Sequence, residues 1–299
     1  SLPSSGKQAH RYAYVTIHYE GTPRDAEYVL GVRVLLASLQ ATSSNADHLI
    51  LVSPTVSDAT VQQLCGAGAL VQLVHDIPNP FKHEVKPRFL LTLNKLHLWR
   101  LTQYDAVTYM DADVIATQSM DVLFPCGTLC VVYMNPCHFH TALMVVKPDL
   151  SEYDRLIDGL QGSKSHDGAD QGFLSHMYGP GMISAPLYVG GEQHTQNTTY
   201  SSFSAGLRRL PSQANMHHMY IQETSSWDIY RIHPPFRNMA KPFLSMTYPV
   251  APLLKPWYWW TYALFIMNWE WLDKRDLLHD DYSGQVAMLA VLPVMCVAA

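Results

Sequence analysis

The amino-acid sequence predicts an α/β fold in which a mostly parallel sheet is flanked by helices. Runs rich in β-branched and aromatic residues, which favour strands, alternate with segments whose apolar residues recur at helical spacing. The fourth of these runs, residues 106–110, ends at two aspartates, Asp111 and Asp113. Because ligands bind outside the carboxyl ends of strands in such sheets, this pair is the first candidate for a functional site.

Each element before the aspartates has its own signal. Residues 12–19 (YAYVTIHY) predict the first strand, and residues 28–39 (YVLGVRVLLASL) predict the first helix. The other predicted strands cover residues 48–52, 70–75 and 106–110, and the other predicted helices cover residues 57–66 and 91–101. Ser57 is expected to cap its helix, because a serine hydroxyl can accept a hydrogen bond from a free amide of the first turn.

The order of elements changes after the aspartate pair. Residues 129–134 and 142–146 are strand-like, and residues 150–160 repeat apolar positions at helical spacing. Residues 167–178 (DGADQGFLSHMY) predict a glycine-containing turn that enters a helix. Only loops and short pieces are expected over residues 188–233.

Composition excludes some partners and leaves the disulfides open. The 299 residues include 25 acidic and 20 basic ones, for a net charge of −5, so we expect no nucleic-acid partner. The five cysteines are Cys65, Cys126, Cys130, Cys137 and Cys296. Their spacing allows a Cys126–Cys130 bridge, or a bridge from either of these to Cys137, and it argues against a zinc site.

Features of both ends favour a Golgi or secretory lumen, with the cytoplasm as the alternative. The sequence starts at Ser1, as after removal of a leader, and residues 197–199 form a glycosylation sequon. Residues 286–299 are apolar and uncharged, and they are either a core segment or the start of a membrane helix, which needs about 20 residues. The aromatic residues before them suit either a membrane interface or packing on the domain: Trp257, Tyr258, Trp259, Trp260, Trp269 and Trp271.

Asp111 and Asp113 are spaced so that their side chains can converge. In an extended segment, residues two apart point to the same side. Carboxylate oxygens favour hard cations such as Mg²⁺ or Mn²⁺, and a cation at this place would neutralise a bound diphosphate and stabilise it as a leaving group. The alternative is a strand-end turn in which one aspartate caps the following helix.

Several stretches together resemble the family 8 glycosyltransferases, the glycogenin and galactinol synthase group. They are LTLNKLHLWRLTQYDAVTYMDADVIATQSMDVLF, LMVVKPD, DGADQGFL and, near the start, YVTIHYEGTPRDAEYVLGVRVLLASL, which together cover about residues 11–180. The resemblance implies a GT-A fold, in which a Rossmann-like nucleotide half is continuous with a smaller acceptor-binding half. It also implies Mn²⁺, a UDP-sugar donor and transfer that retains the anomeric configuration.

The same resemblance implies roles for individual residues. The implied metal ligands are Asp111, Asp113 and His233. The residues implied to contact the nucleotide and its sugar are Thr16, Tyr28, Lys95 and Ala112, with Tyr28 stacked on the uracil. The residues implied at the sugar and the reacting centre are Asp167, Asp170 and Gln171. Taken alone, Asp167 would be a helix cap and Lys95 a solvated lysine.

The sequence departs from the family pattern at three places. Phe139-His140-Thr141-Ala142 stands where the family has an FNSG-like loop that contacts the donor sugar, so His140 and Thr141 leave the sugar's identity open. The family has one basic donor contact where this chain has two, Lys86 and Arg88.

The third departure concerns the lysine that would bind phosphate. Lys241 follows His233 with seven residues between, against five in the family, and it stands before Pro-Phe. Lys255 stands in LLKPWYWW, which resembles the plant branch that glucuronosylates inositol phosphorylceramide. Spacing favours Lys241, and Lys255 is the alternative.

The expected organisation is a single GT-A domain over residues 11–250 and an aromatic-rich segment, 251–299, that is membrane-associated or leads into a membrane helix. The expected activity is Mn²⁺-dependent, retaining transfer of a hexosyl or hexuronosyl unit from a UDP-sugar to a lipid or glycan. Retention could use the leaving phosphate oxygen as base, or a covalent intermediate on Asp167 or Asp170. The alternatives are a glycogenin-like primer that glucosylates itself and a silent nucleotide-sugar-binding protein; homodimerisation is left open.

Overall fold

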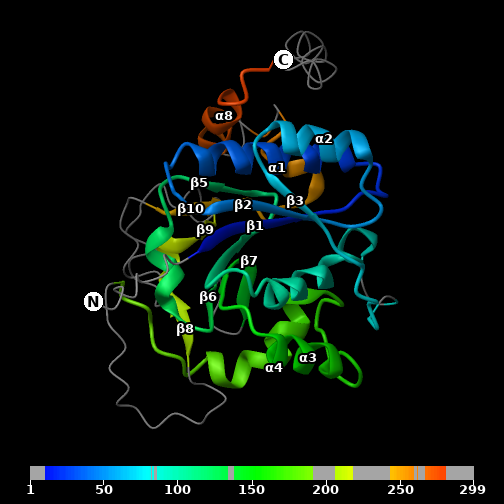
Figure 1. The fold of residues 1–299 in the computed structure, drawn as a ribbon, viewed down its shortest axis with the longest axis vertical. Coiled ribbons are helices and arrows are strands. Elements are labelled where there is room, and N and C mark those ends of the chain that lie inside the picture. Colours follow the sequence, from blue (N-terminus) through cyan, green and yellow to red (C-terminus); the bar gives the residue numbers. More distant parts are fainter. Residues whose placement is uncertain are drawn as a thin grey trace, which may run out of the picture.

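The computed structural model describes residues 11–81, 83, 86–133, 138–190, 206–217, 243–258, 261 and 267–280. Within these ranges the centre is a seven-stranded sheet with the order β3-β2-β1-β4-β7-β6-β8 (Figure 1). Its strands are β1 (Tyr12–His18), β2 (Asp47–Val52), β3 (Leu70–Leu73), β4 (Ala106–Met110), β6 (Leu129–Tyr133), β7 (Phe139–Val146) and β8 (Leu207–Leu210). The helices that pack on it are α1 (Asp25–Gln40), α2 (Asp58–Gly66), α3 (Leu150–Gly159) and α4 (Asp170–Met182).

The predicted α/β class is confirmed. Strand β1 pairs in parallel with β2 and β4, and β2 pairs in parallel with β3. Strand β7 runs antiparallel to both of its neighbours, β4 and β6, and β8 returns to parallel pairing with β6. The mixed sheet therefore keeps the carboxyl ends of β1 and β4 side by side at one edge.

Helices cover both faces of the sheet. Figure 1 shows α1 and α2 on one face and α3 and α4 on the other. Every residue of β4 is buried, as expected for a central strand with both faces covered. Ser57 caps α2 as predicted, since its side chain accepts a hydrogen bond from the amide of Thr60.

Two differences from the sequence prediction concern elements that carry site residues. Residues 91–101 do not form an α-helix but a 3₁₀ segment, η2 (Thr92–Arg100), in which all residues from Thr92 to Trp99 are buried. The Asn94 side chain accepts a hydrogen bond from the Ile77 amide at 2.8 Å. Contacts of this kind with the surrounding chain accompany the 3₁₀ geometry of the segment. Strand β7 begins at Phe139, three residues earlier than predicted, because it continues to pair with β6 beyond a bulge.

Within residues 188–233 the described parts contain only short elements, as predicted. Strands β5 (Val114–Ala116), β10 (Ser245–Thr247) and β9 (Met216–His217) form a small second sheet, and helix α8 (Asn268–Asp276) packs against α1. Trp257, Tyr258 and Trp271 are buried in this part, whereas Trp269 is 53% exposed. Trp259 and Trp260 lie outside the described residues. None of the helices in the described ranges has the length and apolar character needed to span a bilayer.

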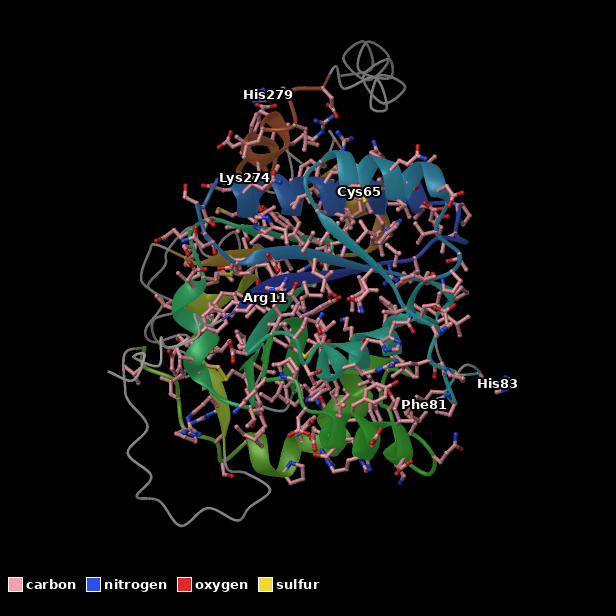
Figure 2. All side chains as sticks on the ribbon, viewed as in Figure 1. Arg11, Cys65, Phe81, His83, Lys274 and His279 are labelled. Carbon is pink, nitrogen blue, oxygen red and sulfur yellow. A yellow bond between two sulfur atoms is a disulfide. The ribbon has the colours of Figure 1, made fainter. Side chains whose placement is uncertain are left out.

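The structure selects one of the cysteine pairings that spacing left open. Cys126, at the end of the short 3₁₀ turn η3 (Asp121–Cys126), is bonded to Cys130 in β6. Cys65, on α2, is exposed and has a free thiol (Figure 2). Cys137 and Cys296 lie outside the described residues.

His97 in the core and the partly buried His48 predict a loss of stability in mild acid. Burial lowers the pKa of His48 and of His97 below the ordinary value. The folded state therefore binds protons less readily than the unfolded chain, so the free energy of unfolding is fully present above about pH 6.5 and declines as the pH falls below it. We expect the melting temperature to drop between pH 7.5 and pH 5.5.

His97→Gln provides the control for this prediction. The His97 ring nitrogen Nε2 lies 2.7 Å from the His75 carbonyl, and a glutamine amide can donate to the same oxygen without titrating. The variant should show a smaller pH effect than the parent chain. A melting temperature that stays constant from pH 7.5 to 5.5 would contradict the prediction.

Candidate active site

A cavity of about 280 Å³ opens at the carboxyl ends of β1 and β4. This is the edge at which open α/β sheets bind their ligands. Most of the residues implied by the family resemblance line it, namely Tyr28, Arg88, Lys95, Asp111, Ala112, Asp113, His140, Thr141, Asp167, Asp170, Gln171 and Lys255. The fold thus gathers residues from six separate stretches of the sequence around one space.

The aspartate pair is held by backbone hydrogen bonds on both sides. The Asp111 amide donates to the Ala142 carbonyl at 2.9 Å, which ties the end of β4 to β7. The Tyr248 amide donates to the Asp113 carbonyl at 3.0 Å, which ties the turn to the segment after β10. The helix-cap alternative does not describe this pair, because both carboxylates line the cavity and each contacts a lysine ammonium group.

Lys95 joins two of the carboxylates. Its Nζ lies 3.0 Å from Asp111 Oδ1 and 2.8 Å from Asp170 Oδ2, and the side chain is 6% exposed. Burial alone would lower the pKa of Lys95, but the two carboxylates outweigh it and raise the pKa above its ordinary value. Lys95 is therefore a buried, charged residue of the site rather than a solvated lysine.

Lys255 contacts the other aspartate. Its Nζ donates to Asp113 Oδ2 and, at 2.7 Å, to the Tyr248 carbonyl, and the side chain is buried. Lys241 and the predicted metal ligand His233 lie outside the described residues, so the preference for Lys241 stays a prediction. The described part of the chain places Lys255 in the cavity.

Asp167 combines a capping contact with a place in the cavity wall. Its Oδ1 accepts the amides of Ala169 at 2.9 Å and Gly172 at 3.0 Å, so it caps the first turn of α4. The expectation of a helix cap is confirmed, Asp167 also lines the cavity, and its role at a sugar stays a prediction. Asp170, at the start of α4, is the buried carboxylate that pairs with Lys95, and Gln171 follows it along the cavity wall.

The altered donor loop reaches the cavity at the start of β7. His140 Nδ1 is buried and has no hydrogen-bond partner among the described residues. Burial lowers the pKa of His140, and the carboxylates of Asp111 and Asp113 oppose this effect. Thr141 Oγ1 lies 3.5 Å from Lys95 Nζ. The loop thus presents an imidazole and a hydroxyl where the family has an amide and a hydroxyl.

Of the residues that the resemblance implies at the nucleotide, some line the cavity and others do not. Tyr28 lines the cavity and packs edge-on against Trp257, with ring centroids 5.5 Å apart, and burial raises its pKa to about 12. Arg88 also lines the cavity. Thr16 lies one residue before the part of β1 that reaches the cavity, and exposed Lys86 lies outside the lining, so their contacts to a donor stay predictions.

The lining residues that were missed at the level of sequence include His18, Tyr19 and Asp25. His18 and Tyr19 follow from the same rule that selected the aspartates, because they stand at the carboxyl end of β1. Asp25 begins α1, and its carboxylate accepts the amides of Gly21 and Thr22. The position at the end of a strand indicated His18 and Tyr19 as candidates. Several residues stand at each strand end, however, and the sequence does not show which of them line a site.

The described residues alone do not complete a metal site. Among them, no group of three or more histidine, cysteine, aspartate or glutamate side chains is placed to hold a metal ion. Asp111 and Asp113 nevertheless offer carboxylate oxygens to the same cavity, which is the donor chemistry that Mn²⁺ takes. The donor set fits such an ion provided that further ligands come from elsewhere.

The fold and the position of the site define the class: the architecture is that of the GT-A glycosyltransferases. The crystal structure of the galactosyltransferase LgtC with donor and acceptor sugar analogues matches with a TM-score of 0.58, at 16% identity, over 92% of this chain and 99% of that one. The glycosyltransferase GlyE of Streptococcus pneumoniae TIGR4 matches with a TM-score of 0.57, at 16% identity, over 92% of this chain and 65% of that one. At these identities the likeness shows the fold alone.

Proteins with similar sequences indicate which glycosyltransferases the chain resembles. The Arabidopsis thaliana protein named "Putative glucuronosyltransferase PGSIP8" is 36% identical over 270 residues, which are 89% of this chain and 51% of that protein. "Inositol phosphorylceramide glucuronosyltransferase 1" from the same plant is 29% identical over 94% of this chain and 49% of its own length. The chain spans about half the length of these curated relatives, and no family model matches it. The predicted resemblance is confirmed: over most of its length the chain is similar to plant proteins named as glucuronosyltransferases, and it shares the GT-A fold of LgtC and GlyE.

Proposed function

We propose that this chain is a retaining, Mn²⁺-dependent glycosyltransferase that uses a UDP-sugar, with UDP-glucuronate as the first donor to test. The single observation that carries the proposal is the arrangement of two aspartates and two buried lysines, Lys95 and Lys255, in one cavity at the carboxyl edge of the sheet. The names of the plant relatives support glucuronate as the transferred sugar.

The charges of the site suit a nucleoside diphosphate. Asp111 and Asp113 would hold Mn²⁺, with His233 as the further ligand that the family resemblance implies. A bound Mn²⁺ supplies positive charge that balances the diphosphate. Lys255 places an ammonium group beside Asp113. In a buried site such a fixed charge stabilises the negative charge that develops on a departing phosphate.

The carboxylates on the α4 side suit the sugar end of the donor. Asp170 is held by Lys95, which in turn holds Asp111, so one ammonium group fixes the distance between the aspartate pair and α4. An ionised carboxylate at this place would stabilise positive charge at the anomeric carbon. Asp167 has one oxygen committed to the helix cap, so Asp170 is the better candidate for this contribution.

The acceptor and the location are the coarsest parts of the proposal. We propose a glycan or lipid acceptor, by analogy with the inositol phosphorylceramide named for one relative. The Cys126–Cys130 disulfide supports an oxidising compartment such as the secretory lumen. Exposed Trp269 on α8 supports contact with a membrane surface, since indole rings favour that interface.

A donor panel tests the function. The chain is incubated with UDP-glucuronate, UDP-glucose, UDP-galactose or UDP-N-acetylglucosamine, with Mn²⁺ or with EDTA, and free UDP is measured. We expect Mn²⁺-dependent UDP release to be greatest with UDP-glucuronate. The intact mass of the protein is recorded in parallel, because added hexoses would favour the self-glucosylating primer. UDP binding without release from any donor would favour a silent binding protein and overturn the proposal.

A further inference from the structure

Lys255 reaches the cavity on a short stretch that α1 holds. We call residues 255–258 (Lys-Pro-Trp-Tyr) the aromatic strap. The Trp257 ring is buried against Tyr28 on α1 and against Trp271 on α8, with centroids 5.5 and 6.3 Å apart. The strap therefore carries a cavity lysine at one end and two anchored aromatic rings at the other.

One carboxylate accepts a hydrogen bond from each of the two aromatic side chains of the strap. Glu27, in the first turn of α1, accepts the Trp257 Nε1 hydrogen at 3.1 Å and the Tyr258 hydroxyl at 2.6 Å. Arg24 donates to both oxygens of Glu27, at 3.2 and 3.1 Å, and to the Tyr258 hydroxyl at 2.5 Å. Each oxygen of Glu27 thus bonds one strap residue and the same guanidinium group, which fixes the carboxylate in one orientation.

Helix α1 also lies against the turn that carries Asp111 and Asp113. Gly31 lies one turn after Glu27, on the same face of α1. A Cβ atom at Gly31 would lie 2.6 Å from the Ala112 carbonyl oxygen and 3.3 Å from the Trp257 ring. The backbone of α1 therefore touches both the residue between the two aspartates and the strap that brings Lys255 to them.

We propose that Glu27 is a positioning residue for donor binding, which acts through Trp257 and Tyr258 to hold the Lys255 ammonium group beside Asp113. The inference rests on the proposed function and deepens it. Glu27 lies outside the cavity lining, and its hydrogen bonds go to the strap and to Arg24, so we expect its effect on a nucleoside diphosphate to pass through the strap to Lys255. Glutamine at this place keeps the shape but replaces one acceptor oxygen by a donor, which opposes either the strap or Arg24.

The experiment measures UDP affinity by titration calorimetry in Mn²⁺ for the parent chain, Glu27→Gln, Lys255→Met and the double variant. We expect Glu27→Gln to weaken UDP binding about tenfold, because a tenfold change in affinity corresponds to about the free energy of one charge-assisted hydrogen bond. In the Lys255→Met background the same substitution should change UDP binding by less than about twofold, because the group it positions is gone. A general structural defect would lower affinity equally in both backgrounds.

The chain offers a matched control. Glu152 accepts hydrogen bonds from Arg155 at 2.8 and 2.6 Å and from the Tyr178 hydroxyl, so it repeats the arginine–glutamate–tyrosine arrangement away from the strap. Glu152→Gln should leave UDP affinity unchanged. If Glu27→Gln does not fold, Tyr258→Phe removes one of its contacts and should weaken UDP binding in the same direction, by a smaller factor.

The outcomes separate this inference from the function on which it rests. UDP binding by the parent chain that Glu27→Gln leaves unchanged, or weakens equally in the Lys255→Met background, overturns the inference alone. Absence of UDP binding by the parent chain in Mn²⁺ overturns both. Loss of affinity in Glu27→Gln that disappears in the Lys255→Met background supports the assignment.

Discussion

Replacing Asp113 with asparagine is expected to lower Mn²⁺-dependent UDP release by about a thousandfold, since metal and oxyanion contacts of this kind contribute several kcal/mol to a transition state. The substitution removes a carboxylate oxygen from the cavity and the negative charge that faces Lys255. The measurement is UDP release from the preferred donor, with the Mn²⁺ concentration varied to detect weaker metal binding.

Two controls make this result specific to the site. The Asp113 side chain is 14% exposed, so its loss leaves the Lys255 charge less well paired, and thermal unfolding must show that the variant is folded under the assay conditions. Asp154→Asn, which changes an exposed carboxylate on α3, should release UDP at the parent rate. Near-parent activity of a folded Asp113→Asn chain would argue against the proposed donor site.

Replacing Lys95 with methionine is expected to reduce the free energy of unfolding by about 3–5 kcal/mol, the range for breaking a buried ion pair. Methionine is of similar length and apolar, but it leaves Asp111 and Asp170 without their shared counter-ion. Asp170 is 4% exposed and cannot recover this interaction from water. Urea unfolding of the parent and the variant measures the difference.

A second substitution tests whether unpaired charge is the cause. In the Lys95→Met, Asp170→Asn double variant one of the stranded carboxylates is neutral, so part of the lost stability should return. Lys147→Met, at an exposed position, should stay within about 0.5 kcal/mol of the parent. A Lys95→Met chain within about 1 kcal/mol of the parent would mean that Lys95 is not the buried counter-ion assigned to it.

The sequence predicted the order of elements in the first half well, because these signals are local. The apolar run of residues 106–110 became β4 with every residue buried, and Asp111 followed it into the cavity. The spacing of the aspartates, the DGADQGFL stretch and the lysine of residues 91–101 marked much of the site. Thr16 and Lys86 were carried over from the family pattern, and neither lines the cavity.

The sequence could not rank contacts between distant parts of the chain. Spacing from His233 favoured Lys241, which lies outside the described residues, whereas Lys255, 142 residues after Asp113, joins Lys95 in the cavity. Neither Asp113 nor Lys255 belongs to a periodic pattern that would predict their contact. The contact depends on how the strap packs on α1. Glu27 shows the same limit: it reads as an ordinary acidic residue of a first helical turn.

By itself, the sequence determined the fold class and the strand end that carries the aspartates, and its motifs indicated the group of proteins that the chain resembles. Periodicity and residue type act over a few neighbours, and they are enough for the fold class and the strand end. The tertiary structure alone decided that Cys126 pairs with Cys130, that Lys95 is buried between two carboxylates and that α1 anchors the strap. Such contacts exist because burial leaves a charge or a polar group with few partners, and which partner it meets depends on the path of the whole chain.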